Sequence, residues 1–206
     1  MGREKPRRQC PGGGRERAAS GDAPSGGPGV KFPAGTVILI RHARAGGQEP
    51  DAPLTPEGER QATQLAEQLW EVDITRIVSS PWLRAVQTIR PLAARLDLPV
   101  QMDERLTERR LSRQPLPFWK TALRASFTLP PLAFPGGESG QEASTRALNA
   151  LNAARDPAGL TVLVTHGNLL ALLLGLDFGG WAALRNPDVW VLEPARAPYR
   201  LEDCCD

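Results

Sequence analysis

Short apolar runs rich in β-branched residues alternate with amphipathic stretches along most of the chain. Buried strands are predicted from three such runs, at residues 36–40, 76–79 and 160–164. Helices are predicted from apolar residues at helical spacing, at residues 56–70, 81–96, 139–155 and 168–176. Shorter extended segments are expected around Val100 and at residues 188–192 and 199–202. The alternation predicts an α/β fold, a three-layer α/β/α sandwich with a mostly parallel central sheet.

Capping residues support two of these helices. Thr55 and Pro56 supply an N-cap and a proline at the first helical position. Ser139 and Glu142 have the spacing of a capping box, and Glu138 precedes them in a glycine-rich turn. Because a turn and a helix cap explain Glu138 and Ser139, they are not assigned to the catalytic set.

Two segments depart from the alternation. Residues 106–135 are proline-rich and irregular, with one helix expected near 118–127, and they predict a small cap insertion over the fold. Residues 1–30 hold eight of the 20 glycines and four of the 20 prolines, and Val30 is their one aliphatic residue larger than alanine. Such a segment buries too little apolar surface to offset its ordering entropy, so we predict a disordered extension before a folded domain at 31–206.

Charge and composition exclude several classes of protein. Six of the 25 Lys and Arg residues and three of the 23 Asp and Glu residues lie in 1–30, which leaves 19 basic and 20 acidic residues from 31 onward, so no nucleic-acid partner is expected. Cys10, Cys204 and Cys205 lie at the ends of the chain, which argues against a disulfide framework or a four-cysteine zinc site. The longest apolar stretch, 169–176, is shorter than the roughly 20 residues of a membrane span. With no apolar signal segment before residue 35, a cytoplasmic location is expected.

Polar side chains follow three of the predicted strands, where ligands bind in open α/β sheets. Arg41 and His42 end the first strand, His166 follows the third, and Arg84 lies one turn into the helix after the second. His42 and His166 are the only histidines in the chain. If their strands are neighbours, about 4.8 Å apart, both imidazoles face one pocket.

Such a pocket suits a compact dianion, and phosphate fits best. Arg41 and Arg84 can bind phosphate oxygens bidentately, and backbone N–H groups near Gly167 add donors at a helix start. A neutral histidine among them can act as a nucleophile toward phosphorus. A metal site is the competing interpretation of paired histidines, but the neighbouring arginines would repel a cation. A single histidine at a strand end is more often structural, and the coincidence of three strand ends favours an anion site.

The sequence resembles the histidine phosphatase superfamily, which includes phosphoglycerate mutases and many small phosphatases. The motifs that carry the resemblance are Arg41-His42, LTPEG at 54–58 with Gln61-Ala62, SSP at 79–81 with Arg84 and Gln87-Thr88, LTE at 106–108, GGES at 136–139 and THG at 165–167. Any one of them is weak, but their order and spacing together are specific. The resemblance covers about residues 36–176.

The resemblance implies a two-step mechanism without a metal or another cofactor. His42 would attack the phosphorus of a phosphomonoester, and water would hydrolyse the phosphohistidine. Arg41, Arg84 and His166 would hold the phosphate oxygens and stabilise the transition state. Glu108 matches the proton donor of the family. The alternative for Glu108 is an exposed surface charge, because two arginines follow it.

The chain departs from the family pattern at two places near the nucleophile. Ala43 stands where glycine is most common, and its methyl group could crowd the phosphate or be tolerated. The polar substrate-binding residue that often follows has two matches, Gln48 by offset and Arg44 as a substitute.

A hydrolase is the first choice for the activity. Mutases of the family carry a much longer segment between the proton donor and the GES turn, whereas 29 residues separate Glu108 from Glu138 here. A phosphoglycerate mutase-type phosphotransferase and a non-catalytic phospholigand-binding domain remain the alternatives. The expected partner is a small phosphorylated metabolite, with a phosphorylated protein as the other substrate class, and the sequence carries no signal for the oligomeric state.

Overall fold

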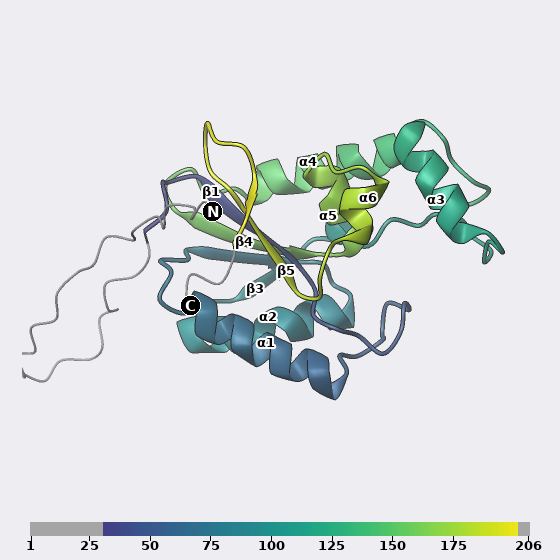
Figure 1. The fold of residues 1–206 in the computed structure, drawn as a ribbon. Coiled ribbons are helices and arrows are strands. Elements are labelled where there is room, and N and C mark those ends of the chain that lie inside the picture. The colour runs from purple at the N-terminus through teal and green to yellow at the C-terminus, as the bar shows by residue number, and fades with distance from the viewer. Residues whose placement is uncertain (1–30, 202–206) are drawn as a thin grey trace, which may run out of the picture.

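The computed structural model describes residues 31–201, so the predicted extension at 1–30 lies outside the described residues. Helices cover both faces of a central sheet (Figure 1). The strands are β1 (Thr36–Arg41), β2 (Arg76–Ser79), β3 (Val100–Met102), β4 (Leu160–Thr165), β5 (Asp188–Leu192) and β6 (Tyr199–Arg200). The helices are α1 (Pro56–Leu69), α2 (Leu83–Leu96), the 3-10 turn η1 (Glu104–Leu106), α3 (Trp119–Thr128), α4 (Gly140–Ala154), α5 (Gly167–Leu173) and α6 (Phe178–Ala182). The predicted α/β/α class is confirmed.

The order of the strands brings the polar strand ends together. The sheet runs β3-β2-β4-β1-β5-β6, with β1 to β4 mutually parallel where they pair and β5 and β6 antiparallel to their neighbours. Strand β4 lies between β1 and β2, with Arg41 paired to Thr165 and Ser79 paired to Val164. The residues that follow these three strands therefore meet at one edge of the sheet.

The two helical layers are specified by alternate residues of the buried strands. Ile38 and Ile40 of β1 pack in one cluster with apolar residues of α1 and α2. Val37 and Leu39 face the other way and pack with residues of α4 and α5. Figure 1 shows α1 and α2 on one face of the sheet and α4, α5 and α6 on the other. Burial on both faces explains why these strands are apolar along their whole length.

Most predicted elements are present, with ends that differ by up to three residues. Helix α6 was not predicted, because it is five residues long and contains Gly179 and Gly180. Asp177 caps it by accepting a hydrogen bond from the Gly180 amide. The predicted cap segment contains α3, whose Trp119 packs edge-on against Trp181 of α6. Within residues 31–201, every helix is too short or too polar to cross a membrane.

Candidate active site

His42 lies immediately after β1 and is fixed through its backbone. Its amide donates to the carbonyl of Thr165 at 3.0 Å, which extends the β1–β4 pairing by one residue. Its own carbonyl accepts a hydrogen bond from Asn186 Nδ2 at 2.8 Å. The next amide, that of Ala43, donates to Thr88 Oγ1 on α2. The sheet and two flanking segments therefore hold the backbone on both sides of the imidazole.

Two contacts define the tautomer of the His42 ring. Nδ1 lies 2.7 Å from the carbonyl oxygen of Ala43, and because a carbonyl only accepts, Nδ1 carries the proton. Nε2 lies 3.1 Å from Arg84 Nε, which only donates, so Nε2 presents a lone pair. Both contacts require the same neutral tautomer, with the lone pair on Nε2.

Arg84 is held rigidly although it is charged. Only 1% of its surface is exposed. Its Nη1 donates to the carbonyls of Gln48 and Glu49, at 3.2 and 2.7 Å, and its guanidinium stacks 4.5 Å above the Trp82 ring. Burial lowers the pKa of Arg84, whereas the charge of Glu108 raises it. A buried cation without a carboxylate in direct contact is suited to an anionic ligand.

His166 follows β4 and lies beside His42. The two ring centroids are 5.1 Å apart in an edge-to-face arrangement, and Trp82 makes a second edge-to-face contact with His166 at 4.7 Å. His166 Nε2 is 2.7 Å from Ser80 Oγ, the residue after β2. Its Nδ1 is buried without a partner among the described residues. An unpaired buried nitrogen of this kind requires an explanation, and a ligand oxygen supplies one.

Burial keeps both histidines neutral. The pKa of His42 is lowered from 6.5 to about 3, mainly by burial and also by the charges of Arg84 and Arg41, whereas the hydrogen bond to Ala43 opposes this change. Burial, the neighbouring His42 and nearby arginines lower the pKa of His166 well below its ordinary value. At neutral pH the lone pair of His42 Nε2 is therefore available without prior deprotonation.

Arg41 closes the site on the side of α5 and α6. Its Nη1 donates to the carbonyls of Leu184 at 2.9 Å and Arg185 at 3.3 Å, just after α6. Its Nε is buried without a hydrogen-bond partner in the described part of the chain. A Cβ atom at Gly167 would lie 3.0 Å from that Nε, so glycine lets the guanidinium pack against the start of α5. Gly167 therefore contributes space in this structure.

Glu108 is not an exposed surface charge. Its carboxylate accepts hydrogen bonds from the amides of Asn168 and Leu169 in the first turn of α5, and from the amide of Arg109. Burial lowers the pKa values of Arg41 and Arg84, and the charge of Glu108 opposes this lowering because it lies near both guanidinium groups. The structure thus brings Glu108 to the same edge of the sheet as the two histidines.

Arg44 and Gln48 are connected to the site differently from the other predicted residues. Both side chains are exposed. Gln48 contributes its main-chain carbonyl to Arg84, and the main chain of Arg44 bonds Gln61 and Thr55. Contacts of these two side chains with substrate stay a prediction.

The methyl group of Ala43 is accommodated in a small apolar cluster. It is fully buried and packs against Leu54 and Ala62. Among the described residues other than glycine, only Asp97 and Ala195 have a positive φ, so the backbone at position 43 does not require glycine.

Three contributors to the site were missed by sequence reasoning. Trp82 contacts His166 edge to face and lies under the Arg84 guanidinium, Asn186 donates to the His42 carbonyl, and the Leu184 carbonyl accepts from Arg41. Trp82 lies inside the SSP–Arg84 motif, so its position next to the predicted pocket was the one available signal. Every residue has a main-chain carbonyl, so the sequence does not mark the one at Leu184. Asn186 is more than 140 residues from His42 in the chain.

Comparison with known proteins identifies the family. The family model of the histidine phosphatase superfamily (branch 1) matches residues 37–193. A Cronobacter sakazakii protein named probable phosphoglycerate mutase GpmB is 35% identical over 163 residues, which is 69% of this chain and 74% of that protein. The native structure of mycobacterial glucosyl-3-phosphoglycerate phosphatase is similar, with TM-score 0.62 and 29% identity over 77% of this chain and 89% of that one. A structure of that phosphatase with inorganic phosphate has TM-score 0.62 and 30% identity over 81% and 94% of the two chains. The chain belongs to the histidine phosphatase superfamily.

Proposed function

We propose that the protein is a phosphomonoester hydrolase that acts without a metal ion, through a phosphohistidine on Nε2 of His42. The observation that carries this proposal is the tautomer of His42, fixed by the Ala43 carbonyl on one side and Arg84 on the other. A ring held neutral with its lone pair on Nε2 is prepared for nucleophilic attack. The surrounding charges are positive, which favours a phosphate dianion over a metal cation.

A phosphate group would be bound by donors that already converge on Nε2. An incoming oxygen would replace Nε2 as the acceptor of the Arg84 Nε–H group, which frees the lone pair to approach phosphorus. Arg41 Nε and His166 Nδ1 are buried and unpaired in the described residues, and they would bind further oxygens. Because these donors are held before substrate arrives, little reorganisation opposes the transition state.

The reaction then proceeds in two balanced steps. In the first, a bond forms between His42 Nε2 and phosphorus, the bond from phosphorus to the ester oxygen breaks, and Glu108 gives its proton to the leaving oxygen. In the second, Glu108 takes a proton from water, the water oxygen bonds phosphorus, and the N–P bond breaks to release phosphate. General acid–base help of this kind contributes about 10²–10⁴-fold.

The relatives suggest where to look for the substrate. One is named a phosphoglycerate mutase and another a glucosyl-3-phosphoglycerate phosphatase. We therefore propose a small phosphorylated metabolite, and phosphoglycerates with and without a sugar are the first compounds to assay. A phosphorylated protein stays the second class to assay.

The decisive experiment measures hydrolysis of an aryl phosphate from about pH 5 to 8 with a chelator present. We expect release of phosphate from the wild-type protein and none from His42→Ala. Rapid acid-free denaturation during turnover should trap an alkali-stable phosphoryl group on the wild-type chain. Turnover that requires an added divalent cation, or that survives in His42→Ala, would contradict the proposal.

Arg84→Ala tests the phosphate-binding half of the proposal. Loss of a preorganised, buried donor is expected to lower kcat/KM by about 10²–10³-fold. Arg84→Lys should recover only part of this, because lysine cannot donate from Nε to phosphate while also reaching the carbonyls of Gln48 and Glu49. Equal activity of Arg84→Lys and wild type would mean that bidentate binding is not used.

A mutase is favoured by one observation, the name of the curated relative. Incubation with 3-phosphoglycerate and its bisphosphate primer separates the activities, since a mutase exchanges the isomers without releasing phosphate. Binding of vanadate or phosphate without turnover of any substrate would instead indicate a non-catalytic binding domain.

A further inference from the structure

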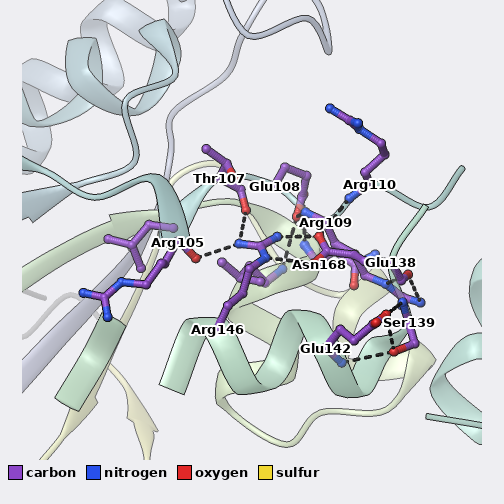
Figure 2. A network of polar contacts seen from close by, with 12 residues as sticks. Arg105, Thr107, Glu108, Arg109, Arg110, Glu138, Ser139, Glu142, Arg146 and Asn168 are labelled. Carbon is purple, nitrogen blue, oxygen red and sulfur yellow. Dashed lines mark hydrogen bonds and ion pairs between the residues drawn. The ribbon is translucent and has the colours of Figure 1, made fainter. Parts of the chain in front are cut away.

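The chain segment that carries Glu108 accepts hydrogen bonds from an arginine of α4. Arg146 Nη1 donates to the carbonyl of Arg105 at 2.6 Å and to the carbonyl of Thr107 at 2.9 Å. Thr107 immediately precedes Glu108, so this guanidinium fixes the peptide that enters the proton donor. Figure 2 shows Arg146 reaching across from α4 to this segment.

Glu138 holds both that arginine and the chain on the other side of Glu108. Its Oε1 lies 2.6 Å from Arg146 Nη2, and its Oε2 lies 2.9 Å from Arg146 Nε, a bidentate ion pair. Oε1 also accepts a hydrogen bond from the amide of Arg110 at 3.2 Å, and the Glu138 amide donates to the Arg110 carbonyl at 2.9 Å. Residues before and after the proton donor are thus held by one pair of side chains (Figure 2).

The neighbour of Glu108 is also anchored to Glu138. Arg109 is 5% exposed, and its Nε and Nη2 donate to the main-chain carbonyl of Glu138 at 3.3 and 3.2 Å. Its Nη1 donates to Ser126 Oγ on α3 at 2.9 Å. The Arg109 side chain therefore links the segment to α3.

Helix capping does not account for Glu138. The capping box of α4 is made by Ser139 and Glu142, whose side chains and amides bond one another. Glu138 lies outside that box, and its carboxylate bonds Arg110 and Arg146. With side chains 23% and 22% exposed, the Glu138–Arg146 pair is half-buried, where a bidentate pair is well ordered and its geometry can be transmitted.

We propose that Glu138 and Arg146 are positioning residues for the proton donor, acting through the backbone of residues 105–110. This inference rests on the proposed function, because it assigns Glu138 and Arg146 to the protonation of the leaving group. The pair keeps the Glu108 carboxylate at the amides of Asn168 and Leu169, beside the nucleophile's strand end. Without the pair, His42 and the phosphate-binding donors stay in place, and the proton transfers made by Glu108 are impaired.

The test compares phosphate esters whose leaving groups differ in basicity. A poor leaving group, such as an alkoxide, needs the proton from Glu108, whereas a nitrophenolate leaves without it. Glu138→Ala and Arg146→Met should lower kcat/KM by about tenfold or more for alkyl phosphates. They should change kcat/KM for p-nitrophenyl phosphate little, because kcat/KM reports the first step and not the later hydrolysis of the phosphohistidine, in which Glu108 is the base for every ester. Glu138→Gln and Arg146→Lys should recover part of the loss.

Glu142→Ala is the matched control, because it weakens the start of the same helix without a contact to residues 105–110. We expect a lower Tm with the leaving-group dependence of the wild type. In a Glu108→Gln background, Glu138→Ala should cause no further loss on alkyl phosphates, since the group it positions is gone. Equal losses of kcat/KM on both ester classes, or additive losses in the double variant, would overturn the inference.

A readout without turnover separates this inference from the proposed function. Amide hydrogen exchange at Asn168 and Leu169 should accelerate in Glu138→Ala and not in Glu142→Ala, because the Glu108 carboxylate no longer protects those amides. Unchanged exchange in Glu138→Ala would overturn the inference whatever the activity. The proposed function is decided separately, by loss of aryl phosphate hydrolysis in His42→Ala.

Discussion

The two halves of the site are built by different means. The half at the strand ends places His42 and His166 through the register of β1 and β4, in which every paired residue of both strands belongs to a continuous ladder. The half contributed by the insertion places Glu108 through side chains that reach main-chain groups, mainly Arg146 and Arg109. The strand-end half depends on regular secondary structure. The insertion half depends on three buried or half-buried charged side chains, those of Arg109, Glu138 and Arg146.

This difference determines how each half responds to change. A ladder between parallel strands is formed by backbone groups, so it tolerates many substitutions as long as the strands stay apolar. A segment held by arginine–carbonyl bonds depends on particular residues, because removing a single side chain releases several backbone groups at once. We therefore expect the insertion half to be sensitive to mutation. The strand-end half contains two histidines whose pKa values are lowered by burial, so we expect its stability to be sensitive to pH.

The largest expected effect is destabilisation in acid, which should originate in the strand-end half. The unfolded chain protonates His42 below its ordinary pKa of 6.5, whereas the folded protein does so only near about 3. Between these values the unfolded state binds more protons, so stability falls as the pH falls. We expect a loss on the order of a few kcal/mol, measured by urea unfolding from pH 7 to 4.

His42→Asn is the control for this prediction, because it removes the titrating group and keeps a polar side chain. Its stability should fall less steeply over the same pH range. His166 should account for part of the remaining slope, since its pKa is also lowered by burial. A wild-type slope unchanged by His42→Asn would show that carboxylates elsewhere dominate acid unfolding, and the comparison between the halves would fail on this point.

The same contrast explains what sequence reasoning could predict. His42, His166 and Arg84 follow apolar runs whose periodicity predicts strands, so their meeting follows from the parallel sheet. Glu108 was assigned by family resemblance, and the surface-charge alternative stayed open until its contacts with the α5 amides were seen. Its place depends on contacts with residues more than 25 positions away, such as that between Arg110 and Glu138, which no local pattern encodes.

Glu138 illustrates the limit most clearly. A helix cap was a sufficient explanation of the GGES turn, and the capping box of Ser139 and Glu142 is confirmed. Because the local explanation was sufficient, there was no reason in the sequence to expect the longer-range contacts of Glu138 with Arg110 and Arg146. Residues that fulfil a local rule can therefore also have a tertiary role, and only the packed structure separates the two.

The insertion half is tested next by Ser126→Ala. Ser126 Oγ accepts from Arg109 Nη1 in a buried position on α3, so its loss leaves a charged donor unpaired. We expect a loss of about 1–3 kcal/mol in unfolding free energy with the wild-type dependence on pH. Thr128→Ala on the same helix is the matched control, because the exposed hydroxyl of Thr128 bonds only the Arg124 carbonyl of its own helix. Equal stability of both variants would mean that α3 does not anchor the insertion.

Ala43→Gly should have the smallest effect, because it changes the strand-end half without touching a hydrogen bond. The Ala43 amide would still donate to Thr88 Oγ1, and the Ala43 carbonyl would still accept from His42 Nδ1. The methyl group contacts Leu54 and Ala62, so its removal leaves a small gap and a more flexible unfolded chain. We expect a loss of about 0.5–1 kcal/mol, with aryl phosphate kinetics within about twofold of wild type. A large gain in kcat would instead mean that the methyl group crowds the phosphate, and that the strand-end half, like the insertion, depends on the identity of single side chains.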